Sequence, residues 1–270
     1  MMENYKLHEI IKFNPNAIAH IENPSNELRL LAVKRNGLVL QYIDCPTREM
    51  QEAAVDNNVR AIQFIDDPTE AMMVRAVSDG WTNLEYIKNP TDAIIRLAVD
   101  QAGWAIKYVD DPSEELQILA VRKNYDSIRF IKKPCRRAQE EAVKISYDAL
   151  RYMNSPTHEA ELIAVKENAQ AIRLVNDLDK TKMLKFLKVN ILVVKYGMKE
   201  IEITRDELEQ AVKEVISDED VEEQYVRDFI NCSAIEKLSN MLPMDKMMFV
   251  YRYGSKKAKK IAVDEKLKRI

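Results

Sequence analysis

Only a few residues of this chain are of types that commonly catalyse reactions or bind metals. The histidines and cysteines are His8, His20, His158, Cys45, Cys135 and Cys232. They are widely spaced, and no two of them follow the close spacing that zinc ligands show. No glycine-rich segment resembles a phosphate-binding loop. The sequence therefore predicts a protein that is not an enzyme, with no catalytic residues, no metal, no cofactor and no evident small-molecule substrate.

Pairs of neighbouring carboxylates are the next candidates for acid–base chemistry. Asp66-Asp67 and Asp110-Asp111 each stand immediately before a proline. Aspartate is favoured at the start of a helix, where its charge complements the helix dipole. We therefore interpret both pairs as helix caps rather than as catalytic groups.

Basic side chains recur at intervals of 22 residues and are the main candidates for binding a partner. The first row is Lys107, Arg129, Arg151, Arg173 and Lys195. The second row is Arg122, Lys144, Lys166 and Lys188. In earlier repeats the first slot holds Ala19, Gln41, Gln63 and Glu85, so its basic character belongs to the later repeats. Stacked repeats would align each row into a ladder, although Lys and Arg are also ordinary solvated residues on helices.

Large aromatic residues stand near the start of successive short segments. They are Trp81, Trp104, Tyr125 and Tyr147. Tryptophan and tyrosine are enriched among the residues that dominate binding energy at interfaces. The sequence leaves two interpretations open, anchors for a partner or packing between repeats.

An internal repeat explains how these residues are positioned. Prolines occur at every twenty-second position, at Pro24, Pro46, Pro68, Pro90, Pro112, Pro134 and Pro156. Each is followed by Ser, Thr or Cys, and an Ala-Val pair stands eight residues after each proline. An aromatic row keeps the same step, at Tyr42, Phe64, Tyr86, Tyr108, Phe130 and Tyr152. A fixed period of this length indicates a solenoid.

Each repeat is predicted to contain a longer and a shorter helix. In one example, Asp67 is the expected N-cap, Pro68 the first helical residue, and Glu70 the partner in a capping box. The longer helix should end near Asp79-Gly80, and a shorter helix should follow over residues 81–87. The aromatic row, with His20 in the same slot, is assigned to the core. Helices this short are unstable alone, so the repeats must stack against one another.

The sequence predicts an all-α fold: an α-solenoid of about nine two-helix units with a 22-residue period, followed by a helical C-terminal region. Residues 1–13 are expected to form an N-terminal capping half-repeat. The predicted units are 14–35, 36–57, 58–79, 80–101, 102–123, 124–145, 146–167, 168–189 and 190–214. The ninth unit carries a three-residue insertion. Residues 215–270 show no period, with helices expected to start near Ser217 and to span 234–242, 244–253 and 256–268.

Composition limits the classes of partner and compartment. Hydrophobic residues make up 46% of the chain, which is enough for a continuous core. The net charge of −3 predicts no bulk attraction to nucleic acid or to a membrane. An odd number of widely spaced cysteines favours a reducing compartment, and we expect a cytoplasmic protein.

Two segments resemble a known family. Residues 32–42 and 120–130 are similar to the short helical repeats, of pattern Ala-Val-x-x-Asn-Gly-x-x-Leu-x-Tyr, of a family of unknown function. That family occurs in large DNA viruses, phages and intracellular bacteria, and the resemblance covers about residues 10–214. It implies a helical-repeat fold without catalytic residues. It also implies a viral, phage or effector protein that acts on host machinery, in which case the compartment would be the host cytoplasm.

The sequence supports two functional hypotheses. The first is a scaffold that binds a protein partner, because solenoids present long surfaces of variable residues on a constant frame. The alternative is a helical-repeat protein that binds nucleic acid through the basic rows, since some helical repeats read one base per unit. Neither hypothesis predicts an oligomeric state.

Overall fold

The structure is a computed structural model that describes residues 2–197, 201–237 and 244–268. Within these ranges every regular element is a helix and no strand is present, which confirms the predicted all-α class. Contacts divide the chain into two compact units, Met1–Lys133 and Pro134–Ile270. The boundary falls between the two helices of the predicted unit 124–145.

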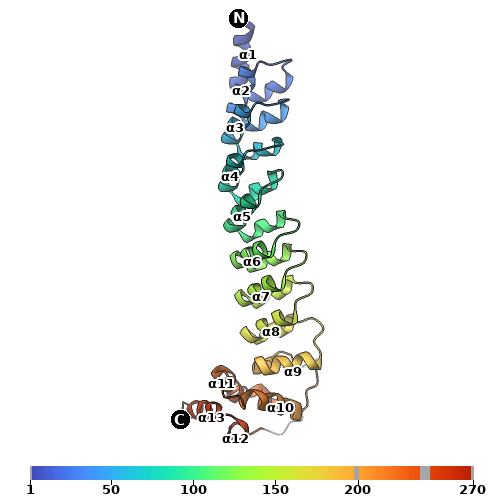
Figure 1. Ribbon diagram of the computed structural model, residues 1–270, viewed down its shortest axis with the longest axis vertical. Helices are drawn as coiled ribbons and strands as arrows, with labels where there is room; N and C mark the ends of the chain where they lie inside the picture. The colour runs from blue at the N-terminus through green and yellow to red at the C-terminus, as the bar shows by residue number, and fades with distance from the viewer. Residues whose placement is uncertain (1, 198–200, 238–243, 269–270) are drawn as a thin grey trace. The chain divides into compact units, whose positions relative to one another are not determined.

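The first compact unit alternates α-helices with short 3-10 helices, which are labelled η. Its elements are α1 (Met2–Phe13), η1 (Pro15–His20), α2 (Asn26–Arg35), η2 (Gly37–Tyr42), α3 (Arg48–Asn57), η3 (Val59–Phe64), α4 (Glu70–Asp79), η4 (Trp81–Tyr86), α5 (Asp92–Gln101), η5 (Gly103–Tyr108), α6 (Glu114–Lys123) and η6 (Tyr125–Phe130). Each α-helix packs against the next α-helix in the chain, and each η helix against the next η helix (Figure 1). The unit is therefore a solenoid with one row of α-helices and one row of η helices.

The second compact unit continues this pattern and then departs from it. Its elements are α7 (Arg136–Ile145), η7 (Tyr147–Tyr152), α8 (His158–Glu167), η8 (Ala169–Leu174), α9 (Lys180–Val189), η9 (Ile191–Lys195), α10 (Arg205–Ile216), α11 (Glu223–Asn231), η10 (Ser233–Lys237), α12 (Lys246–Tyr253) and α13 (Lys256–Leu267). Helices α7 to α10 pack in series, as do η7 to η9. Helix α11 then packs against η9 and α13.

The start of each long helix differs from the prediction by two residues. Thr69, not Asp67, is the N-cap of α4, and its hydroxyl accepts a hydrogen bond from the Met72 N–H at 3.3 Å. Pro68 therefore precedes the cap, and Glu70 is the first helical residue rather than the partner in a capping box. The reason is geometric, because a side-chain oxygen caps a helix when it can reach the N–H three residues later. The same bond recurs at the N-caps Ser25, Thr47, Thr91, Ser113, Cys135 and Thr157.

The short helices are 3-10 helices of five or six residues. Asn58 is in the extended region, at φ −150°, and its Oδ1 accepts a hydrogen bond from Arg60 N–H at the start of η3. The side chain of Asn58 therefore caps η3. In a helix with three residues per turn, residues i and i+3 share a face. Ile62 and Ile65 accordingly point into the core.

The aromatic row was assigned to the core, and this prediction is wrong. Tyr42 is 49% exposed and Phe130 is 39% exposed, while Phe64, Tyr86 and Tyr108 are half-buried. Each aromatic residue is the last residue of its short helix and comes directly before the C-cap, which is buried at Ile65, so the row lies at the edge of the buried face. The aromatic side chains therefore form part of the surface of the η helices. His20, in the same slot, is exposed as well.

The core consists instead of the Ala-Val pairs and the aliphatic residues of the η helices. Both members of the pair are fully buried in every repeat from α2 to α8. Close approach is tightest at Gly103, where an added Cβ would lie 2.1 Å from the carbonyl oxygen of Ala120. The Gly103 N–H also donates to Asn124 Oδ1 at 2.9 Å. The end of α6 therefore limits the space at the start of η5, and the asparagine that follows α6 accepts a hydrogen bond from the first N–H of η5.

The C-terminal region is helical, as predicted, but begins differently. Ser217 ends α10 as its C-cap, and Glu222 is the N-cap of α11, so the expected helix start at Ser217 is wrong. Helix α10 begins 25 residues after α9 rather than 22, which agrees with a three-residue insertion. Helices α12 and α13 match the two last predicted helices. The expected helix over residues 234–242 is a 3-10 helix as far as Lys237, and the rest lies outside the described residues.

Candidate partner-binding face

The residues with potential for catalysis are not brought together. Among the described residues, no three His, Cys, Asp or Glu side chains lie close enough to hold a metal ion. Cys45 is exposed, Cys232 is buried, and the Cys135 Sγ accepts the capping hydrogen bond from Ala138 N–H at 3.4 Å. The carboxylate pairs are not caps, because the Ser or Thr after each proline takes that role.

These carboxylates instead join neighbouring loops. Lys88 Nζ donates to Asp66 Oδ1 at 2.6 Å, and Lys132 Nζ donates to Asp110 Oδ1 at 3.2 Å. The hydrogen bond and the charge of Lys88 lower the pKa of Asp66. Both bonds connect loops one repeat apart, so they support the stacking of repeats rather than a reaction.

The first basic row lies on the exposed side of the η helices. In the first compact unit it contains Lys107 and Arg129. Lys107 Nζ lies 4.5 Å from the ring centroid of Tyr108 and 5.3 Å from that of Trp81. Arg129 Cζ lies 5.9 Å from the ring centroid of Phe130. Each cation therefore borders an aromatic ring, an arrangement that stabilises both groups.

Two of the predicted aromatic anchors belong to the same surface. The rings of Trp81 and Tyr108 are 6.3 Å apart between centroids. Trp104 is 39% exposed, and its Nε1 donates to Asp126 Oδ1 at 2.8 Å. Tyr125, at the start of η6, is half-buried. Trp81 and Trp104 thus contact residues one repeat away, as packing between repeats predicts, and Trp104 keeps part of its surface in solvent. Their role as anchors for a partner stays a prediction.

Acidic residues on this surface were not identified from the sequence. Arg129 Nη2 forms an ion pair with Asp126 Oδ2 at 2.6 Å, within η6. The same pair occurs in η7, where Arg151 Nε lies 2.8 Å from Asp148 Oδ1. The signal was available, because Tyr-Asp-x-x-Arg occurs at residues 125–129 and again at 147–151. At these two positions the first row therefore consists of ion pairs rather than of cations alone.

The rest of the first row belongs to the second compact unit. Arg173 Cζ lies 4.8 Å from the ring centroid of Tyr196, and Lys195 is exposed. Tyr147, the last predicted anchor, is half-buried at the start of η7. Helix η8 packs against η7 and η9, so these residues share one surface of this unit.

The second basic row has a different role. Arg122 is exposed on α6, and Lys144 pairs with Glu141 on the same helix at 3.3 Å. Lys166 Nζ lies 2.6 Å from Glu222 Oε1, and Lys188 pairs with Glu214. The last two lysines therefore connect the repeats of the second compact unit to α10 and to the start of α11.

A cavity lies beside these two ion pairs. Its volume is about 400 Å³, and Lys166, Lys188, Asp218 and Tyr225 are among the residues that line it. The Tyr225 hydroxyl donates to the carbonyl of Leu187 at 2.9 Å, and burial raises its pKa. The Tyr225 hydroxyl, Lys166 and Lys188 are thus already bonded to protein groups beside this cavity.

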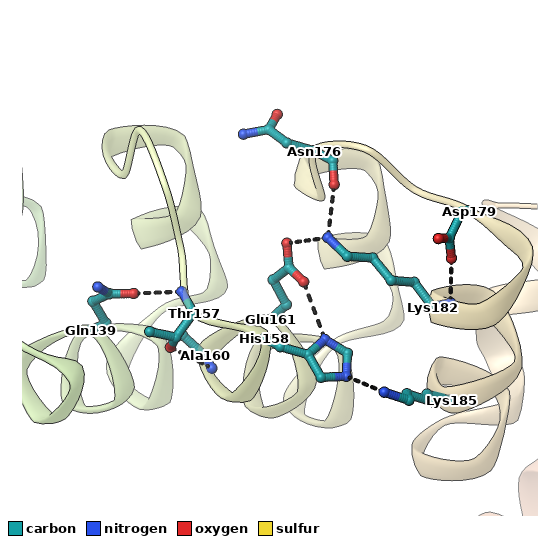
Figure 2. Close-up of polar contacts among 9 residues, drawn as sticks. All are labelled: Gln139, Thr157, His158, Ala160, Glu161, Asn176, Asp179, Lys182 and Lys185. Atoms are coloured by element: carbon teal, nitrogen blue, oxygen red, sulfur yellow. Dashed lines mark hydrogen bonds and ion pairs between the residues drawn. The ribbon is translucent and has the colours of Figure 1, made fainter.

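A buried polar cluster joins α8 and α9 (Figure 2). Glu161 has a side chain only 3% exposed and accepts bonds from Lys182 Nζ at 3.1 Å and His158 Nδ1 at 3.4 Å. Lys182 also donates to the carbonyl of Asn176 at 3.0 Å, while Lys185 Nζ lies 3.4 Å from His158 Nε2. The buried charge is therefore matched by several donors, and the cluster fixes the packing of α8 on α9.

Comparison of the chain with known protein families, characterised proteins and solved structures finds no match in any of the three. None of the helices in the described part of the chain combines the length and apolar character that a membrane crossing requires.

Proposed function

We propose that the chain is a non-enzymatic scaffold that binds a protein partner through the exposed side of its η helices. We define the short-helix face as Trp81, Trp104, Lys107, Tyr108, Asp126, Arg129 and Phe130, all in η4 to η6 of the first compact unit. The observation that supports the proposal is the recurrence of half-exposed aromatic rings bordered by charges of both signs.

Aromatic rings and arginine are the groups that contribute most to binding energy at protein interfaces. On this face they are held by contacts between repeats, such as the bond from Trp104 to Asp126. Side chains that are already ordered lose less conformational freedom when a partner binds. The face is therefore suited to contribute affinity, while the charged residues around it contribute selectivity.

A protein partner is favoured over nucleic acid by the sign of the charges. Asp126 pairs with Arg129, and Glu85 accepts a hydrogen bond from the Tyr108 hydroxyl at 3.2 Å. These carboxylates would repel phosphates that approach the same surface. A protein can instead offer its own cations and amides to them.

Nucleic acid is the second candidate, and one observation favours it. Cations placed beside aromatic rings, as in Lys107 beside Tyr108 and Arg173 beside Tyr196, are typical of surfaces that bind single strands by stacking and charge. Such binding weakens steeply with added salt. The salt dependence therefore distinguishes the two candidates.

The test compares Trp104→Ala with a matched control, Phe13→Ala, which removes an exposed aromatic residue on α1. Proteins retained from a lysate by the wild-type chain are identified with and without nuclease treatment, and the binding of each is then measured directly. We expect Trp104→Ala to weaken binding by about 2 kcal/mol, or thirtyfold, and Phe13→Ala to have no effect. Equal binding by both variants contradicts the proposal. Loss of every partner after nuclease treatment favours the nucleic-acid alternative.

A further inference from the structure

The exposed side of the last two helices combines apolar side chains with a cluster of lysines. Helices α12 and α13 contact each other and are joined by Gly254 and Ser255. Four large apolar side chains of these helices are exposed: Met248 (59%), Tyr251 (70%), Val263 (54%) and Leu267 (63%). We call these four residues the C-terminal apolar patch. Single exposed apolar residues are common, but four on adjacent helices are characteristic of an interaction surface.

A cluster of lysines stands at the start of α13. Lys256, Lys257, Lys259 and Lys260 occupy four of its first five positions, after the N-cap Ser255. The first turn contains no acidic residue. Cations at a helix N-terminus face the positive end of the helix dipole, which is unfavourable for the helix. This arrangement concentrates positive charge at an end of the helix where the dipole does not favour it.

The lysines have few partners within the protein. In the described part of the chain, no carboxylate lies within ion-pair distance of Lys256, Lys257 or Lys260. Lys259 Nζ lies 5.8 Å from the ring centroid of Tyr251. The pKa of Glu223 is lowered mainly by Arg227 and to a smaller extent by the charge of Lys257. The ammonium groups of Lys256 and Lys260 in particular are therefore available to an external anion.

The lysines and the apolar patch occupy one side of α13. Residues three, four, seven and eleven positions apart share a face of an α-helix, which groups Lys256 and Lys260 with Val263 and Leu267. The opposite face of α13 is buried through Ala258, Ile261 and Ala262. The contact of Lys259 with Tyr251 brings the patch residues of α12 next to this face.

We propose that this face of α12 and α13 binds the surface of a bilayer that contains anionic lipids. Clusters of four or more lysines beside exposed apolar residues attract anionic headgroups, while the apolar side chains enter the boundary between headgroups and acyl chains. Nucleic acid would satisfy the lysines but would offer nothing to Val263 and Leu267. The proposal is independent of the function of the short-helix face.

The test is sedimentation of the full chain with vesicles of phosphatidylcholine alone and of phosphatidylcholine with phosphatidylserine. We expect binding only to the vesicles with phosphatidylserine. The variant Lys256→Gln/Lys257→Gln/Lys260→Gln should lower the partition coefficient on the order of a hundredfold, about fivefold for each lysine. The variant should fold, because removing these cations relieves repulsion by the helix dipole. Circular dichroism checks its helix content.

Two further variants separate the contribution of the apolar side chains from that of the net charge. Val263→Ser/Leu267→Ser removes the apolar residues from an exposed position and should lower the partition coefficient about tenfold or more. The control Lys34→Gln/Lys88→Gln/Lys123→Gln makes the same change in net charge in the first compact unit and should leave vesicle binding unchanged.

Three results would overturn the proposal. The first is absence of binding to vesicles that contain phosphatidylserine. The second is equal loss of binding in the control and in the α13 lysine variant, which would reduce the effect to net charge. The third is vesicle binding that does not respond to the serine substitutions, together with binding of a single-stranded oligothymidylate that requires the α13 lysines. That result would assign the surface to nucleic acid instead.

Discussion

Removal of Lys182 should destabilise the second compact unit, and removal of Glu161 together with Lys182 should largely restore its stability. The two residues form a buried ion pair between α8 and α9, with Glu161 also bonded to His158 (Figure 2). The slot of Lys182 is apolar in every earlier repeat, whereas the slot of Glu161 is apolar in some repeats and polar in others. In α4 and α5 the equivalent pair is Met73 and Ile94, and both side chains are buried. Apolar side chains at both positions therefore have a precedent within the same solenoid.

The expected loss of stability follows from how deeply each of the two charged side chains is buried. Removing one partner of a buried ion pair costs about 3–5 kcal/mol, because the other charge is left in a poorly solvated place. Lys182 has a side chain 28% exposed and His158 still bonds Glu161, so Lys182→Met should cost about 3 kcal/mol. Glu161→Met leaves only a partly exposed lysine unpaired and should cost about 1 kcal/mol or less. The double variant should lie within about 1 kcal/mol of the wild type.

The assay is urea unfolding followed by circular dichroism, together with hydrogen exchange of the amides of α8 and α9. The local probe is needed because solenoid repeats contact only their neighbours, so that unfolding need not be a single transition. The increase in exchange should be confined to α8, α9 and their immediate neighbours. If Lys182→Met costs no more than Glu161→Met, the buried carboxylate is not compensated by this lysine and the reasoning is refuted.

Two further predictions concern stacking and acid stability. Gly103→Ala should destabilise the chain by about 1–3 kcal/mol, because the new Cβ would lie 2.1 Å from the carbonyl oxygen of Ala120. The control Gly80→Ala meets no atom closer than 3.9 Å and should be neutral within about 1 kcal/mol in the same urea titration. The pKa of Glu207 is lowered from 4.5 to about 2, mainly by its bond to Lys180. A carboxylate whose pKa is lowered by folding stabilises the fold at any pH above the pKa that it has in the unfolded chain. This stabilisation is lost as the pH falls from about 4.5 to about 2. Glu207→Gln should therefore lower the melting temperature at neutral pH, and the difference from wild type should disappear at the acid end of this window.

The period of the repeat could be predicted from the sequence because it depends on single residues. Every long helix from α2 to α8 begins two residues after its proline, and the buried Ala-Val pair stands at the same place in each. The exact cap was not predictable from the Asp-Pro pair alone. Both Asp67 and Thr69 are residues that cap helices, and only the backbone shows which oxygen reaches the Met72 N–H.

The exposed residues were harder to predict than the repeat, because exposure depends on the type of helix and on contacts between distant residues. The aromatic row was assigned to the core on hydrophobicity, but the short helix is a 3-10 helix, in which Ile62 and Ile65 occupy the buried face. With three residues per turn, Phe64 lies about a third of a turn from both of them, at the edge of that face. Ion pairs that connect distant parts of the chain, such as Lys166 with Glu222, leave no periodic signal at all.

The contrast between buried residues that stay constant and exposed residues that vary from repeat to repeat supports a binding role more directly than any single residue does. The slot before the aromatic row is at least partly exposed throughout the first compact unit, and it changes from Gln63 to Glu85, Lys107 and Arg129 along four successive repeats. The Ala-Val pairs behind it do not change. Exposed substitutions of this kind alter stability little, so the slot is free to vary without cost to the stacking of the repeats. A surface whose charge differs from one repeat to the next, on a frame that stays constant, can match a partner that itself varies along its length.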